Sequence, residues 1–100
     1  MPLSEGKKQP ITGECVRLPV VKAVTAPRKL AEANPDRQGL TVFNNSTATL
    51  FLDFGTMTSS ATFLVAIAPG GYWESPFLCT EALWGVWNRA TGNALIREFV

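Results

Sequence analysis

The most informative absence in this 100-residue chain is histidine, which does not occur at all. Histidine is the commonest general base at neutral pH and the usual partner of a serine or cysteine nucleophile. It is also a standard zinc ligand, and the two cysteines, Cys15 and Cys79, do not have the spacing of a metal site. We therefore expect that the protein is not an enzyme and that it binds neither a metal nor a cofactor.

Long hydrophobic runs and a strong net charge are missing as well. The nearly uncharged stretch 55–72 is interrupted by Thr, Ser, Gly and Pro and is too polar to span a bilayer. No apolar segment follows the first lysines, as it would in a secretory signal. The net charge of +1 favours neither nucleic acid nor a membrane as a partner. We expect a protein made in a cytoplasm, where Cys15 and Cys79 stay reduced.

The charges that are present divide the chain unevenly. Residues 1–30 carry six basic and two acidic side chains, a net charge of +4, whereas residues 31–100 carry three basic and six acidic ones, a net charge of −3. Residues 1–19 show no apolar periodicity and contain three prolines and two glycines. They predict an extended N-terminal arm, and residues 20–100 predict one domain. The arm residues that we expect to contact a partner are Lys7, Lys8 and Arg17.

Short runs of β-branched and large apolar residues recur about every ten residues over the rest of the chain. No segment shows a convincing helical period, because Pro27 and Pro35 bracket the one stretch of helix-forming residues. The pattern predicts an all-β fold, an antiparallel β-sandwich of seven to eight short strands that is jelly-roll-like or immunoglobulin-like and follows the extended arm. The expected strands are 20–25, 28–31, 40–43, 48–54, 62–67, 72–74, 83–89 and 94–100.

Turn residues predict how these strands connect. The tetrad Asn44-Asn45-Ser46-Thr47 lies between two apolar runs and predicts a central β-hairpin of 40–43 with 48–54. Thr91-Gly92-Asn93 predicts a second hairpin before the last strand. At Pro69-Gly70, proline fixes φ and glycine supplies a positive φ, as a type II turn requires.

Alternation along the strands predicts which side chains are buried. Trp84 and Trp87 lie among apolar residues and are predicted to pack in the core. Tyr72 and Trp73 differ, because they follow a Gly-Gly turn at the start of a strand, where a ring can reach the surface. Tyrosine and tryptophan dominate the hot spots of protein interfaces, so both are expected to contact a partner protein. The residues predicted to point inward are Leu50, Leu52, Val65, Trp84 and Val86.

Three segments together carry a resemblance to a known family. The loop Asn34-Pro35-Asp36-Arg37 leads into a strand that ends in Asn44-Asn45, an apolar strand ends at Gly55, and Pro69-Gly70-Gly71-Tyr72-Trp73-Glu74 contains a turn. Over residues 20–100 this pattern resembles a loose family of small β-sandwich virion proteins from tailed bacteriophages. The family includes capsid decoration (cement) proteins and small neck or tail proteins. The resemblance implies no catalytic residue, and the arm is not part of it.

The resemblance implies a structural virion protein, in the first place a cement protein that binds and stabilises the shell of the major capsid protein at the capsid surface. We expect a homo-oligomer, with a trimer favoured and a dimer as the alternative, and with segment 70–76 near the contacts. A neck or tail component is the alternative within this class. The alternatives from other classes are a carbohydrate-binding sandwich and a small hydrolase using two carboxylates among Asp53, Glu74, Glu81 and Glu98.

Overall fold

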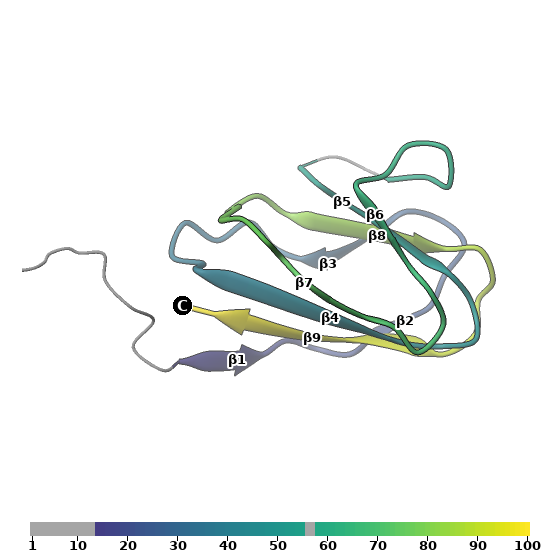
Figure 1. Ribbon diagram of the computed structural model, residues 1–100, viewed down its shortest axis with the longest axis horizontal. Helices are drawn as coiled ribbons and strands as arrows, with labels where there is room; N and C mark the ends of the chain where they lie inside the picture. The colour runs from purple at the N-terminus through teal and green to yellow at the C-terminus, as the bar shows by residue number, and fades with distance from the viewer. Residues whose placement is uncertain (1–13, 56–57) are drawn as a thin grey trace, which may run out of the picture.

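The computed structural model describes residues 14–55 and 58–100, which form strands and loops arranged as two antiparallel sheets without a helix (Figure 1). None of these residues therefore belongs to a helix able to cross a membrane. Sheet A contains β1 (Cys15–Arg17), β2 (Val21–Lys22), β4 (Gly39–Asn45), β7 (Tyr72–Glu74) and β9 (Asn93–Phe99). Sheet B contains β3 (Arg28–Ala31), β5 (Leu50–Phe54), β6 (Val65–Ile67) and β8 (Leu83–Trp87). The all-β prediction is confirmed, and the two sheets are consistent with a β-sandwich.

The strand order within each sheet differs from the order along the chain. Sheet A has the order β1-β9-β4-β7, with β2 pairing β9 next to β1, and sheet B has the order β3-β8-β5-β6. Each predicted strand occurs, four of the eight in shortened form, and β1 is an additional strand within the predicted arm. The arm residues 14–19 thus lie along sheet A, while residues 1–13 lie outside the described part of the chain.

Both predicted hairpins are wrong, because the chain crosses between the sheets at these turns. β4 lies in sheet A and β5 in sheet B, and β8 lies in sheet B and β9 in sheet A. The turn at Pro69-Gly70 has the predicted form, with φ of 73° at Gly70 and a 2.8 Å hydrogen bond from Gly71 N–H to the Ala68 carbonyl. It also joins the two sheets, from β6 to β7. Turn residues thus mark where a strand ends but not which strand it pairs with.

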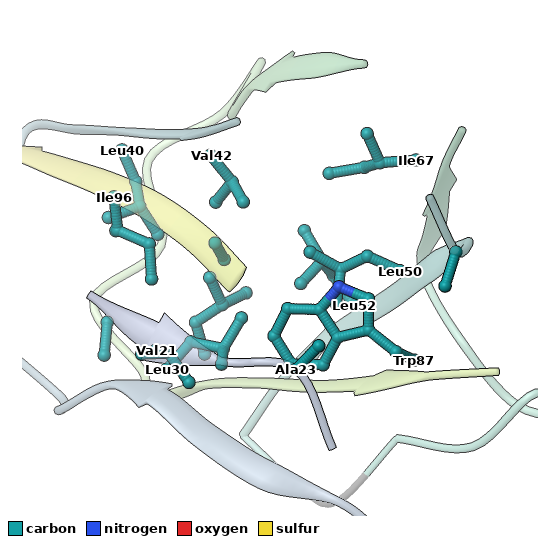
Figure 2. Packing of buried hydrophobic residues seen from close by; sticks show 14 residues of the cluster. Val21, Ala23, Leu30, Leu40, Val42, Leu50, Leu52, Ile67, Trp87 and Ile96 are labelled. Carbon is teal, nitrogen blue, oxygen red and sulfur yellow. The ribbon is translucent and has the colours of Figure 1, made fainter. Parts of the chain in front are cut away.

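The core lies between the sheets, where alternate side chains from both meet (Figure 2). Leu50 and Leu52 are fully buried as predicted, and Val65 is half-buried against the same cluster. Trp87 is buried as predicted as well. The side chains that fill the centre of the core are Leu40, Val42 and Ile96 from sheet A and Leu50, Leu52, Leu83 and Trp87 from sheet B.

The inward orientation predicted for Trp84 and Val86 is wrong. Successive strand residues point to opposite faces, so the burial of Leu83 and Trp87 between the sheets puts Trp84 and Val86 on the outer face of sheet B. Trp84 is half-exposed there, and Lys29 Nζ lies 5.6 Å from the centroid of its ring. Val86 is buried, but outside the inter-sheet cluster. Apolar residues on both faces of β8 made the direction of its side chains ambiguous.

A buried ion pair holds the loops at one end of the two sheets. Arg37 Nε donates to the Glu98 carboxylate at 2.7 Å, and both side chains are almost fully buried. The other guanidinium nitrogens of Arg37 donate to the carbonyls of Glu32, Cys79 and Glu81. The Arg37 side chain therefore joins β9 to the loops before β4 and after β7. Four of its five N–H groups thus donate to an oxygen atom, which offsets much of the cost of burying a guanidinium.

Asn44 plays the corresponding part at the opposite end. Its side chain is fully buried and donates to the carbonyls of Ala48 and Ile67 at 2.8 and 2.9 Å. Its Oδ1 accepts hydrogen bonds from Trp87 Nε1 at 3.1 Å and from the Ser46 hydroxyl at 2.7 Å. These bonds connect strands of both sheets, which explains why an asparagine stands at position 44 close to the end of β4.

Candidate protein interface

The residues predicted to contact a partner lie at two opposite edges of sheet A. Arg17 lies in β1 at one edge, whereas Tyr72 and Trp73 lie in β7 at the other, with β9 and β4 between them (Figure 1). Lys7 and Lys8 fall outside the described residues. The structure therefore does not bring the predicted contacts into one cluster, and each edge has to be considered separately.

Tyr72 and Trp73 point to opposite faces of β7. Tyr72 lies on the outer face of sheet A with 62% of its surface exposed, as predicted for one of the two rings. Trp73 points inward, is half-buried and packs against the core cluster. Its ring lies 6.3 Å from that of Phe54, which in turn lies 6.2 Å from the half-exposed ring of Phe77. The rings of Trp73, Phe54 and Phe77, here called the aromatic cluster, line the open side of the sandwich beside β7.

The backbone of β7 has hydrogen-bonding groups that point away from sheet A. Asn44 N–H donates to the Gly71 carbonyl at 2.8 Å, and Ser75 N–H donates to the Leu40 carbonyl at 2.9 Å. Residues 71, 73 and 75 therefore face β4, and by the alternation of an antiparallel ladder residues 72 and 74 face outward. Among the described residues, no hydrogen bond reaches the outward N–H and C=O groups of Tyr72 and Glu74. β7 thus presents an open sheet edge.

The outer face of sheet A carries two parallel rows of side chains. Phe43 lies between Tyr72 and Leu95 on the neighbouring strands and forms an apolar row with them. In the next row, Arg97 lies opposite Arg17 of β1. Like charges directly opposite each other on a sheet are unfavourable, and neither arginine forms an ion pair with another described residue. The two arginines are therefore suited to an acidic group of a partner.

The outer face of sheet B differs, because the segment 58–64 lies against part of it. Phe63 packs on Phe51 with ring centroids 5.0 Å apart, and Thr58 is buried and donates to the Thr62 carbonyl. This segment and the strands border an open hollow of about 350 Å³ next to Val86. No comparable segment among residues 14–55 and 58–100 covers the row of Tyr72, Phe43 and Leu95, whose side chains remain exposed or half-exposed.

Other parts of the described surface have fewer features that indicate a binding site. A groove of about 400 Å³ runs between β2 and β3, with apolar and charged walls. Cys15 is exposed, Cys79 is half-buried, and both are free thiols. Residues 14–55 and 58–100 contain no cluster of three acidic, cysteine or histidine side chains that could hold a metal ion. The β7 edge and the outer face of sheet A are therefore the candidate interface.

Comparisons of this chain with protein-family models, with curated proteins and with solved structures find no match. The candidate interface accordingly rests on the geometry described above. The sequence pointed to Tyr72 and Trp73 through the Gly-Gly turn before them. It did not indicate Phe43, Leu95 or Arg97, because their common face depends on which strands are neighbours.

Proposed function

We propose that this protein is a non-enzymatic structural component of a virus particle, in the first place a capsid decoration protein that binds the major capsid protein at the capsid surface after synthesis in a bacterial cytoplasm. The observation that carries the proposal is the outer face of sheet A, which no other described segment covers. Its apolar row of Tyr72, Phe43 and Leu95 lies beside Arg97 and Arg17, which form no ion pair with a described residue. Exposed apolar patches rimmed by polar side chains are typical of protein-binding surfaces.

The strand order supports a jelly-roll assignment of the sandwich. Two sheets of four strands with the orders β2-β9-β4-β7 and β3-β8-β5-β6 have the composition of an eight-stranded jelly roll, with β1 as an addition. In an immunoglobulin fold several consecutive strands are neighbours in one sheet. Here, among the described strands, β5 and β6 are the only consecutive strands that are neighbours in one sheet. Jelly rolls occur in viral capsid proteins and in lectins, which agrees with the resemblance to phage virion proteins.

On a symmetric shell, several weak contacts made at the same time are sufficient for stable binding. A homo-oligomer on a capsid engages several copies of the major capsid protein at once, so the effective concentration of each further contact is high. The outer face of sheet A would bind the shell, and the segment 1–13 with Lys7 and Lys8 would add a second contact. Both the trimer favoured from the sequence and the dimer would make several such contacts at once. A neck or tail component would use the same surface at another place in the particle.

Co-sedimentation with capsids of the phage that encodes the chain tests the proposal. Arg97→Glu removes the arginine pair and places an acidic side chain opposite Arg17, which favours the fold while opposing an acidic partner. Arg89→Glu changes the net charge equally at an exposed site outside the interface and is the matched control. We expect Arg97→Glu to lower capsid occupancy and Arg89→Glu to leave it unchanged. Wild-type occupancy for Arg97→Glu would contradict the proposal, and an image of the decorated particle would separate head from neck or tail.

One observation favours sugar binding as a second candidate. The half-exposed ring of Trp84 lies on the outer face of sheet B with Asp53 opposite it on β5 and Lys29 opposite it on β3. Aromatic rings flanked by polar groups can stack on sugars. Quenching of tryptophan fluorescence by oligosaccharides in the wild type, lost in Trp84→Ala, would support this function over capsid binding.

A further inference from the structure

The open edge of β7 has a geometry that fits a second copy of itself. We propose that β7 pairs with β7 of another copy, antiparallel about a twofold axis at Trp73, so that two copies of sheet A form one continuous sheet. The outward groups of Tyr72 and Glu74 supply the hydrogen bonds. The N–H and C=O of Tyr72 bond to those of Glu74 in the second copy, and symmetry doubles the set. The pairing deepens the proposed role of β7 as an interface, but it does not depend on which particle the protein binds.

Only one register forms all of its hydrogen bonds between residues of β7 whose N–H groups are all available. A shift that places Tyr72 opposite Tyr72 pairs Glu74 with Gly70, whose N–H already donates to Asn44 within its own chain. The opposite shift places Glu74 against Glu74, where like charges repel, and Tyr72 against Pro76, which has no N–H. The register of Tyr72 with Glu74 avoids both defects.

The side chains agree with this register. On the outer face each Glu74 lies opposite Tyr72 of the other copy, so no like charges are directly paired. On the inner face the two Trp73 rings meet across the axis, where opposite residues of a non-hydrogen-bonded pair come closest. The aromatic cluster of each copy, including the half-exposed Phe77, then lies beside this contact. The pairing would therefore cover apolar surface and at the same time give hydrogen-bond partners to the outward backbone groups of Tyr72 and Glu74.

The neighbouring edge strand of sheet B is less open. β6 lies beside β7 on the same side of the sandwich, but the carbonyl of Ile67 already accepts a hydrogen bond from the Asn44 side chain at 2.9 Å. β3, at the far side of sheet B, carries Arg28 and Lys29 and has an irregular register with β8 after Lys29. Charges and bulges are the usual protection of an edge against pairing. β7 is thus the edge that is best suited to self-association.

Sedimentation analysis of the free full-length protein over a range of concentrations tests the pairing without any capsid. We expect a mass that rises from one chain of 10.8 kDa to two chains. In Glu74→Pro the outward N–H is lost while the hydrogen bonds to β4 remain, because proline is tolerated on an edge where the N–H faces solvent. The dissociation constant should rise about tenfold to a hundredfold, since two symmetric hydrogen bonds disappear. Glu74→Gln keeps the N–H and should dimerise like the wild type.

A charge exchange tests the register. Tyr72→Glu places an acidic side chain opposite Glu74 of the other copy and should raise the dissociation constant about tenfold, because two symmetric pairs change at once. The double variant Tyr72→Glu/Glu74→Arg makes these pairs attractive and should restore dimerisation. A wild-type protein that stays a single chain at all concentrations overturns the proposal but leaves capsid binding intact. A Glu74→Pro dimer of wild-type affinity, or no rescue by the double variant, overturns the proposed pairing as well.

Discussion

The two edges of sheet A present similar backbone groups with very different side chains. At one edge β1 and β2 are short, are separated by Pro19 and carry Arg17 and Lys22. At the other edge β7 is uninterrupted, contains two aromatic residues and has Glu74 as its one charge. Natural proteins protect their edges with basic residues, proline and short strands. Both edges are short, with three residues in β1 and three in β7, but only the first edge carries basic residues and a proline between its strands, so the second edge is the one that we propose to bind.

This comparison depends on a rigid frame between the two edges, and Arg37→Ala is the change that should weaken the frame most. The variant leaves Glu98 buried without its ion-pair partner. Glu98 lies in β9, the strand with which β1 pairs. Breaking a buried pair in this way costs about 3–5 kcal/mol. Arg89→Ala, which removes an exposed arginine, should cost less than about 1 kcal/mol. Denaturant unfolding measures both, and equal losses would show that the buried pair does not hold the frame.

The two aromatic residues of β7 should differ in what they contribute to folding. Trp73→Ala removes a half-buried ring that packs on the core and on Phe54, and we expect a loss of about 2–3 kcal/mol, below the range for fully buried rings. Tyr72→Ala truncates an exposed ring and should cost less than about 1 kcal/mol in the monomer. Thermal unfolding in the Glu74→Pro background separates folding from association. Equal losses would mean that β7 is not oriented as described.

Removing the protection of the other edge should make it associate. In Pro19→Thr/Lys22→Thr the interruption and one charge disappear, so the β1 and β2 edge resembles an ordinary exposed strand. We expect species larger than a dimer to appear at high protein concentration, because each copy then has two edges able to pair. Sedimentation detects them. If the double variant stops at the same mass as the wild type, these residues do not protect the edge.

Salt should change the affinities of the two proposed contacts differently, and the change should be smaller for the β7 pairing. The β7 pairing has no ion pair, so raising the salt from about 50 mM to about 500 mM should change its dissociation constant less than about twofold. Capsid binding through Arg17 and Arg97 should weaken over the same range, because exposed charges are screened. A dimer that dissociates in salt would indicate an electrostatic contact in place of strand pairing.

The positions of the strands could be predicted from the sequence, but their neighbours could not. Alternating apolar residues are a local signal, and they correctly indicated β3, β4, β5 and β7. A turn such as Asn44-Asn45-Ser46-Thr47 has the same composition whether the chain folds back as a hairpin or crosses to the other sheet. The crossing is favoured by the buried side chain of Asn44, which bonds to Ala48, Ile67 and Trp87. Two of these partners are far away in the sequence, so the signal is not local.

The candidate interface could be predicted only in part for the same reason. At least one ring of Tyr72 and Trp73 was expected at the surface because of the turn before them, and in the structure the exposed ring is that of Tyr72. Trp84 was placed in the core because both faces of β8 are apolar, and nothing local shows that Trp87 takes the inward position. The row of Phe43 and Leu95 depends on β4 and β9 being neighbours, which are separated by about half of the chain.

Hydrogen exchange at the outward amides of the two edges tests the central claim most directly. Tyr72 and Glu74 in β7 and Cys15 and Arg17 in β1 all direct their N–H groups away from sheet A, because their neighbours in sequence face β4 or β9. The account predicts that the amides of Tyr72 and Glu74 become protected as the protein concentration rises, while those of Cys15 and Arg17 exchange quickly throughout. Fast exchange of all four amides at every concentration would contradict it.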